Sequence, residues 1–238
     1  MKKKMVSVVC PFFNEEAIIE KSVQGMLKNL ASLSDEWELI IVNDGSTDRS
    51  FELARQLEKE NAHLNVIGYP VNKGRGFAIR TGVAHAQGEI VVTTEIDSSW
   101  GDDIVRRILD KFNERPDADM VIASPNLSQG GYKNVPFKRV LLSRMGNLFI
   151  RASLKRGISM YTGMTRGYRL KKFLALPLDE NGKEIHLEIV NKAISFNYNI
   201  YQVPAVLEWK TDKLVKDSVK KRKSKSNINR IIRTHLLY

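Results

Sequence analysis

The chain is poor in cysteine and has no long apolar run. Its one cysteine, Cys10, cannot form an internal disulfide or a zinc cluster, so we expect a buried apolar side chain in a reducing compartment. A membrane-spanning helix needs about 18 consecutive apolar residues, and the 238-residue sequence has no such run. The apolar stretch at 6–10 is too short for a secretory signal. We therefore expect neither a disulfide scaffold, nor a spanning helix, nor secretion.

Two glycine-rich phosphate-binding motifs are also missing. No G-x-G-x-x-G follows the first predicted strand, which argues against a dinucleotide site, and no G-x-x-x-x-G-K-S/T occurs, which argues against a P-loop. A G-x-G-T-R-type loop is absent there as well, which disfavours a nucleotidyltransferase. What is present is ordinary globular composition, 42% hydrophobic and 8% aromatic, over a length that suits one large α/β domain or two small ones.

Positive charge is in excess and unevenly distributed. Lysine and arginine number 38 against 27 aspartate and glutamate, a net charge of +11. Segment 210–233 holds ten of these cations and two acids, so it carries +8 and the rest of the chain is close to neutral. Such a cluster fits a solvated helix face, an anionic membrane surface or nucleic acid. No nucleic-acid-binding motif or interleaved aromatic residues accompany it, so we expect no nucleic acid partner.

Short β-rich runs alternate with helical patterns in the first half of the chain. Strands are predicted at 6–10, 38–42, 65–68, 89–94 and 120–124. Helices, with apolar residues at helical spacing, are predicted at 17–33, 48–61, 75–86 and 102–113. Several strands are apolar on both faces, as in a sheet covered by helices on both sides. The alternation therefore predicts an α/β fold with a mostly parallel central sheet flanked by helices.

The second half of the chain is less regular. Residues 125–136 contain glycine and proline breaks among polar residues and are interpreted as a long loop. Helices are predicted at 137–154 and 184–196, and a β-like stretch at 201–209. The chain has no internal repeats and no evident interdomain linker. We therefore expect one domain over 1–209, followed by a basic segment over 210–238.

Polar residues follow each of the first two predicted strands. Asn14 and Glu15 come after the first strand, and Asp44 comes after the second. Ligands of open α/β sheets bind outside the carboxyl ends of the strands, so we expect these side chains to lie together at a ligand site. Taken singly, each run also fits the capping of the helix that follows it.

A glycine-rich basic loop precedes the third predicted helix. Residues 72–76 contain two glycines and the cations Lys73 and Arg75. Backbone N–H groups and positive charge at a helix start suit a diphosphate. The alternative is an ordinary loop with two solvated cations.

Two acids, Glu95 and Asp97, follow the fourth predicted strand. Strand alternation points both carboxylates to the same side. Together with nucleotide phosphates they could therefore bind one hard divalent cation such as Mg²⁺ or Mn²⁺. The alternative is a pair of surface acids at a strand end.

Taken in order, these segments resemble the motifs of the inverting GT-A glycosyltransferases of family 2, which include dolichol- and polyprenol-phosphate mannose and glucose synthases. Residues 11–15 (PFFNE) resemble the family's P-x-x-N-E, 42–48 (VNDGSTD) its V-x-D-G-S-x-D, and 72–76 (NKGRG) its N-x-G-K-G. The resemblance covers most of the chain. It implies a GT-A nucleotide-diphospho-sugar transferase fold and a metal-dependent hexosyltransferase.

The resemblance also implies roles for individual residues. Glu95 and Asp97 would bind Mg²⁺ or Mn²⁺, with Asp97 matching the last acid of the family's D-x-D motif. Glutamate in place of the usual aspartate at 95 changes the reach of that carboxylate by a methylene. The residues expected to bind a GDP- or UDP-sugar donor are Pro11, Phe13, Asn14, Glu15, Asp44, Lys73 and Arg75.

The acceptor half departs from the family pattern. Residues 163–169 (GMTRGYR) resemble an acid followed by T-S-G-F-R, but Gly163 stands at the acid's position. A hydroxyl acceptor needs a general base near neutral pH, whereas a phosphate monoester, with a second pKa of about 6, arrives largely ionised. We therefore expect a polyprenyl (dolichyl) phosphate acceptor held by cations, for which Arg139, Arg144 and Arg169 are candidates. Of the residues named so far, Asp97 and Arg169 are the ones expected to act in catalysis.

Two other readings stay open. If the acceptor is a hydroxyl on a glycan, Glu188 in the predicted helix 184–196 is the candidate base. A non-catalytic basic binding protein on the same fold is the third reading. The basic segment, through 210–233, would hold the enzyme on an anionic membrane surface. We accordingly expect a cytoplasmic protein, peripheral at the inner face of the membrane.

Overall fold

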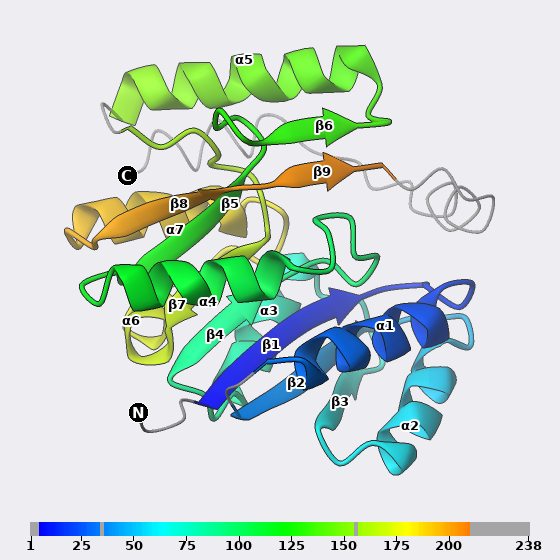
Figure 1. Cartoon of the computed structure of the whole chain (residues 1–238). Coiled ribbons are helices and arrows are strands. Elements are labelled where there is room, and N and C mark those ends of the chain that lie inside the picture. The colour runs from blue at the N-terminus through cyan, green and yellow to red at the C-terminus, as the bar shows by residue number, and fades with distance from the viewer. Residues whose placement is uncertain (1–4, 34–35, 155–156, 210–238) are drawn as a thin grey trace.

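The computed structural model describes residues 5–33, 36–154 and 157–209, and strands in this part of the chain form a seven-stranded sheet and a two-stranded one (Figure 1). The large sheet has the order β3-β2-β1-β4-β7-β5-β8. Its strands are β1 (Met5–Phe12), β2 (Glu36–Asp44), β3 (Leu64–Tyr69), β4 (Ile90–Thr93), β5 (Met120–Ser124), β7 (Arg166–Arg169) and β8 (Ile200–Pro204). The small sheet pairs β6 (Gly131–Lys133) with β9 (Val206–Glu208).

Helices cover both faces of the large sheet. They are α1 (Ile19–Ala31), α2 (Ser50–Glu60), α3 (Arg75–Ala84), α4 (Ile104–Glu114), α5 (Phe137–Leu154), α6 (Leu170–Leu174) and α7 (Ile185–Ser195). In Figure 1, α1 and α4 lie in front of the sheet and α3 lies behind it. Gly82 of α3 packs directly on Val9 and Val42, because a Cβ at this glycine would overlap both valines. Residues 39–42 of β2 are fully buried and apolar on both faces of the sheet, because helices cover both faces.

All strand pairs of the large sheet are parallel except those made by β7. That strand runs antiparallel to both β4 and β5. The carboxyl ends of β1, β2 and β4 therefore share one edge with the start of β7, whereas the end of β7 lies at the opposite edge. This edge gathers the polar segments that follow the strands. The α/β fold with a mostly parallel sheet, as predicted, is confirmed.

Five short elements differ from the sequence-based expectation. The loop predicted at 125–136 contains β6, and the β-like stretch at 201–209 is two strands in two different sheets, β8 and β9. Neither β7 nor α6 was predicted. Elements of three to five residues carry too little periodicity to stand out, and β7 is held by its two neighbours. Gly167 in β7 also lets α4 approach, since a Cβ there would overlap Ile108 and Phe112.

The basic segment predicted at 210–238 lies outside the described residues. Of the helices in the described part of the chain, none is both long enough and apolar enough to cross a membrane. Cys10 is completely buried in β1, as expected, and burial raises the pKa of its thiol.

Candidate active site

The ends of β1 and β2 are joined by hydrogen bonds. Asn14 adopts a left-handed backbone conformation with φ of 53°, and its Oδ1 accepts the N–H of Thr47 at 2.8 Å. In return, the N–H of Asn14 donates to Ser46 Oγ at 3.0 Å, and the N–H of Glu15 donates to Ser50 Oγ at 2.7 Å. The two segments predicted from separate motifs therefore form one polar edge, with Pro11 and Phe13 half-buried beside it.

Asp44 holds the basic loop in place. Its carboxylate accepts hydrogen bonds from the Tyr69 hydroxyl at 2.8 Å, from Asn72 Nδ2 at 3.0 Å and from the Lys73 N–H at 2.9 Å. Burial and this carboxylate both raise the pKa of Tyr69. Asp44 is 5% exposed and Glu15 is fully buried, so each is built into the scaffold of the edge. Their contact with base and ribose stays a prediction.

The start of α3 is capped by another part of the protein. The N–H groups of Gly76 and Phe77 donate to the carbonyl oxygen of Asn181 at 2.7 and 3.3 Å. The N–H of Gly74 donates to Asp44. A Cβ at Gly76 would overlap the Glu180 carbonyl, so this close approach requires glycine. The expectation that backbone N–H groups of this loop contact a diphosphate is therefore corrected.

Side chains of the same loop remain available for phosphate. The ammonium of Lys73 lies 4.5 Å from the centroid of the Phe77 ring and 5.3 Å from that of Tyr69. Arg75 extends towards the acid pair, with its Nη1 3.7 Å from Glu95 Oε1. These two cations thus lie at the edge of the sheet where a donor was predicted.

Glu95 and Asp97 lie in a turn after β4 and not on the strand itself, which ends at Thr93. The turn, rather than strand alternation, brings the two carboxylates together. Glu95 Oε2 accepts from Ser99 Oγ at 2.9 Å and from Trp100 Nε1 at 2.8 Å. Asp97 Oδ1 accepts the N–H of Ser99 at 3.0 Å. Burial and the neighbouring Glu95 charge raise the pKa of Asp97.

The chemistry of this pair fits a divalent metal. Burial and then the neighbouring Glu95 charge raise the pKa of Asp97, and a shared cation would favour the ionised form of both carboxylates. Carboxylate oxygens are the ligands that Mg²⁺ and Mn²⁺ prefer. Within the described ranges no group of three or more His, Cys, Asp or Glu side chains is placed to hold a metal. The remaining ligands would have to be water or diphosphate oxygens.

A cluster of three cations faces the acid pair, and sequence reasoning missed one of them. Lys183, just before α7, has a pKa lowered by burial and then by the charges of Arg75 and Arg139. The carboxylates of Glu184 and Glu95 act on it in the opposite direction. Arg75, Arg139 and Lys183 therefore share one region although they come from α3, α5 and the α7 approach. No sequence spacing links these residues, which are between 44 and 108 positions apart.

Arg169 does not belong to this site, which corrects its assignment as a catalytic, phosphate-holding residue. Because β7 is antiparallel, Arg169 pairs with Ile90 at the start of β4, at the far edge of the sheet. Its guanidinium donates to Glu89 and to the carbonyls of Pro116 and Ala118, at 2.6 to 2.9 Å. The other end of β7, Arg166, lies at the edge that carries the acid pair.

Arg166 is fully buried and fixes the surroundings of the cation cluster. Its Nη1 donates to the His186 carbonyl at 2.7 Å and its Nη2 to the Tyr161 carbonyl at 2.5 Å. Burial lowers the pKa of the guanidinium. Burial and the adjacent Arg166 charge hold the pKa of His186 well below its ordinary value. Together these contacts tie β7, the 161 region and α7 to one another.

Glu188 is buried in α7 and holds a loop. Its carboxylate accepts the N–H groups of Asp179 and Glu180 at 2.9 and 3.0 Å and pairs with Lys192 Nζ at 2.8 Å. The carboxylate is completely buried, and all three of these donors belong to the protein itself. The geometry favours a positioning role, through the loop whose Asn181 caps α3. As the candidate base, Glu188 stays an untested prediction with this geometry against it.

The remaining two arginine candidates separate. Arg139 lies over the Trp209 ring at 4.5 Å and takes part in the cation cluster. Arg144 lies over Tyr132 at 5.5 Å, and no interaction described here connects it with the acid pair. Arg139 is therefore the better candidate for contact with an acceptor phosphate.

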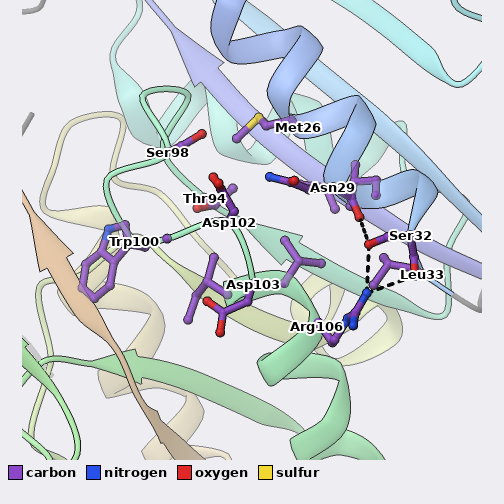
Figure 2. Close-up of a pocket in the computed structure, with 15 residues that line it drawn as sticks. Met26, Asn29, Ser32, Leu33, Thr94, Ser98, Trp100, Asp102, Asp103 and Arg106 are labelled. Carbon is purple, nitrogen blue, oxygen red and sulfur yellow. Dashed lines mark hydrogen bonds between the residues drawn. The ribbon is translucent and has the colours of Figure 1, made fainter.

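A cavity of about 270 Å³ borders the acid-pair turn from the α1 side (Figure 2). It is lined by residues of α1, the 98–103 turn and the start of α4, including Met26, Leu30 and Trp100. Arg106 Nη2 donates to the Ser32 carbonyl and hydroxyl at 3.0 and 2.8 Å at its rim. None of the predicted donor or metal residues lines this cavity. The polar edge, defined by its charged groups, is therefore the candidate active site.

Comparison with protein families gives a match over most of the sheet. The family model described as glycosyl transferase family 2 matches residues 7–176. The dolichyl-phosphate beta-glucosyltransferase of Trichomonas vaginalis is 29% identical over 153 residues, 61% of this chain and 47% of that protein. The undecaprenyl-phosphate 4-deoxy-4-formamido-L-arabinose transferase of Salmonella choleraesuis is 28% identical over 167 residues, 70% of this chain and 49% of that protein. The matches thus span about half the length of these relatives.

Solved structures share the fold. The glucosyl-3-phosphoglycerate synthase of Mycobacterium tuberculosis, in a complex with Mn²⁺, UDP-glucose and phosphoglyceric acid, superposes with a TM-score of 0.67. The superposition covers 98% of this chain and 79% of that one, at 20% sequence identity. At this identity the likeness concerns the fold, which is that of the GT-A glycosyltransferases.

Proposed function

Since this chain belongs to glycosyltransferase family 2, we propose that it transfers a sugar from a nucleoside-diphosphate sugar to a polyprenyl phosphate, with inversion at the anomeric carbon. The two curated relatives described above are named as transferases that act on dolichyl or undecaprenyl phosphate, which supports this acceptor. The donor base, UDP or GDP, and the sugar, mannose, glucose or another hexose, are for experiment to identify.

One observation carries the proposal: an acid pair and three cations lie together at the carboxyl edge of the sheet. Arg75 lies 3.7 Å from Glu95, and the charges of Arg75, Arg139 and Glu95 all act on Lys183. Two anionic groups meet in the proposed reaction, the diphosphate of the donor and the phosphate of the acceptor. Burial and the charges of Arg75 and Arg139 lower the pKa of Lys183. Bound phosphate groups would supply the negative charge that favours its ammonium form.

The residues of this site can support the transfer without a general base. An oxygen of the acceptor phosphate bonds to the anomeric carbon while the bond from that carbon to the diphosphate oxygen breaks. The electron pair leaves with the nucleoside diphosphate, and no proton has to be removed from an acceptor that is already ionised. Glu95 and Asp97 would hold a Mg²⁺ or Mn²⁺ ion, which supplies positive charge for the leaving diphosphate. Arg75 and Lys183 add charge, and Arg139 is placed for the acceptor.

A hydroxyl acceptor is the second candidate, and Glu184 favours it. This buried carboxylate at the start of α7 acts on Lys183 and is thus close to the cluster. It could remove the proton of an attacking hydroxyl, whereas Glu188 is engaged elsewhere. A structural neighbour was solved with phosphoglyceric acid, which carries both a hydroxyl and a phosphate. On this reading the cations would bind the acceptor's phosphate and Glu184 would be the base.

The donor is tested by calorimetric titration of UDP, GDP and their sugar conjugates, with and without Mn²⁺ or Mg²⁺. We expect one nucleotide to bind to the wild-type protein, and its binding to require the metal. In Asp97→Asn we expect weak nucleotide binding that no longer depends on the metal. Asp110→Asn, an acid on α4, serves as the matched control. Failure of every nucleotide to bind the wild-type protein would overturn the transferase proposal and leave the basic binding protein.

The acceptor is tested by comparing polyprenyl phosphate with phosphoglyceric acid in the transfer assay. For the lipid phosphate, Arg139→Gln should raise the acceptor KM, while Glu184→Gln should leave kcat nearly unchanged. For a hydroxyl acceptor, Glu184→Gln should lower kcat by about 10²–10⁴, the usual contribution of a general base.

We also propose, following the relatives' lipid acceptors, that the protein acts as a peripheral protein at the inner, cytoplasmic face of a membrane.

A further inference from the structure

Helix α5 presents an apolar stripe to solvent. Phe137, Leu141, Met145 and Leu148 recur at intervals of three or four residues and so lie on one side of the helix, with Leu142 beside them. Their side chains are between 46% and 77% exposed. Single exposed leucines are common on protein surfaces, whereas several together on one helix face form an apolar patch. In Figure 1 this helix lies at the top of the molecule, above β6 and away from the large sheet.

Few side chains of α5 are buried against the protein. Among those described, the buried ones are Ile150 and Asn147, whose Oδ1 accepts the N–H of Tyr161 at 2.7 Å and whose Nδ2 donates to the Ser143 carbonyl. Most of the large apolar side chains of the helix therefore face outwards. This arrangement suits a helix whose outer face meets a second apolar phase.

The charge around the stripe is of one sign. Between Asp119 and Asp179 the sequence has no acidic residue, and the segment that forms α5 contains four cations. Lys138, Arg139 and Arg144 are exposed next to the stripe. An apolar helix face flanked by lysine and arginine is the composition of helices that lie in the interface of anionic bilayers.

The end of the described chain lies beside α5. β9 pairs in parallel with β6, the strand that precedes α5, and the N–H of Trp209 donates to the Lys133 carbonyl at 2.9 Å. Trp209 is also the ring under Arg139 of α5. The segment that follows Trp209 in the sequence, 210–233, carries a net charge of +8.

We propose that the outer face of α5 docks on an anionic phospholipid bilayer, with Phe137, Leu141, Met145 and Leu148 inserted between the lipid head groups. A second copy of this chain would bring two positive faces together, so the bilayer is the better occupant. The inference rests on the proposed function only for the role of the docking. Arg139 of α5 belongs to the cation cluster, where the proposed function has the phosphate of a lipid acceptor bind.

The test attaches an environment-sensitive fluorophore to single cysteines in the full chain. Met145→Cys lies in the stripe, and Leu174→Cys, equally exposed but on α6 and far from α5 in Figure 1, is the matched control. The native Cys10 is buried and does not compete for the label. With vesicles of equal parts phosphatidylcholine and phosphatidylglycerol, we expect a blue shift and protection from iodide quenching at 145 and neither at 174.

A second variant measures the stripe's contribution to vesicle binding by sedimentation. Leu141→Ser with Leu148→Ser should reduce partitioning by about tenfold or more, because each replaces an apolar side chain worth over about 1 kcal/mol on insertion. Unchanged partitioning and no shift at 145 would overturn the proposal and leave any binding to the basic segment. A shift at 145 that depends on protein concentration without vesicles would overturn it in favour of a second copy. Nucleotide affinity, measured on the same samples, separates failure of docking from failure of the proposed transferase.

Discussion

Glu188 and Lys192 form a buried ion pair one turn apart on α7, with 2.8 Å between Oε1 and Nζ. The same carboxylate holds the N–H groups of Asp179 and Glu180, and the next residue, Asn181, caps the start of α3. The pair therefore connects α7 with the helix that carries Arg75. A residue chosen from sequence as a base is, in the structure, the support of a loop.

We expect Glu188→Gln to destabilise the protein strongly. The substitution removes the buried carboxylate 2.8 Å from the ammonium of Lys192, whose side chain is 7% exposed, and leaves the more distant Asp179 carboxylate at 3.4 Å. Removing one partner of a buried pair costs about 3–5 kcal/mol, which urea denaturation at pH 7 would measure. The double variant Glu188→Gln with Lys192→Met should recover part of that loss, since it removes the buried ammonium as well.

Activity of the same variant distinguishes a support from a base. If Glu188 is a supporting residue, Glu188→Gln should lower transfer to every acceptor, together with the fraction of folded protein. Normal stability combined with loss of transfer to hydroxyl acceptors alone would instead establish Glu188 as the base.

Asp97→Asn should have opposite effects on binding and on stability. The pKa of Asp97 is raised in the folded protein, so its carboxylate contributes stability only at low pH, and that contribution disappears as pH rises through the folded-state pKa. At pH 7, without metal, asparagine should therefore raise the Tm in differential scanning calorimetry. With Mn²⁺ and nucleotide present, the wild-type protein should gain Tm and the variant should not. A lower Tm for the metal-free variant would contradict the repulsion between Glu95 and Asp97.

Arg169→Ala should affect stability and spare the active site. Its three hydrogen bonds to Glu89, Pro116 and Ala118 lie at the far edge of the sheet. We expect a loss of about 1–3 kcal/mol in unfolding free energy and unchanged nucleotide affinity for the folded protein. Lys183→Met provides the contrast, with little loss of stability and weaker binding of diphosphate. A large drop in the nucleotide affinity of Arg169→Ala would contradict this prediction and assign Arg169 to the active site.

The stability of the protein should fall in mild acid because of His186. Burial and Arg166 hold its pKa in the folded state well below the ordinary 6.5, so below that pH the unfolded chain binds a proton that the folded protein excludes. The unfolding free energy should decrease by up to about 1.4 kcal/mol per pH unit. Urea denaturation between pH 7 and pH 5 should show this slope in the wild-type protein. The slope should be smaller in His186→Gln, and equal slopes would refute the assignment.

Much of the site could be predicted because its parts are local in sequence. Asn14 and Asp44 were found from the polar runs that end two strands, and the structure joins those runs. Glu95 and Asp97 are two positions apart and stay together in any compact turn. Lys183 could not be found in this way, because nothing near it in sequence indicates Arg75 or Arg139 as neighbours. Trp100, which holds Glu95 through its indole N–H, was likewise not among the site residues predicted from sequence.

The sequence by itself determined the α/β class, the succession of strands and helices, and the chemical character of each strand end, because apolar period and turn residues are properties of neighbouring positions. The tertiary structure alone decided which ends of the strands share an edge. The antiparallel direction of β7 moved Arg169 away from the site and brought Arg166 to it. Hydrogen bonds across long sequence distances likewise decided that Glu188 supports a loop and that Asn181, not a phosphate, caps α3.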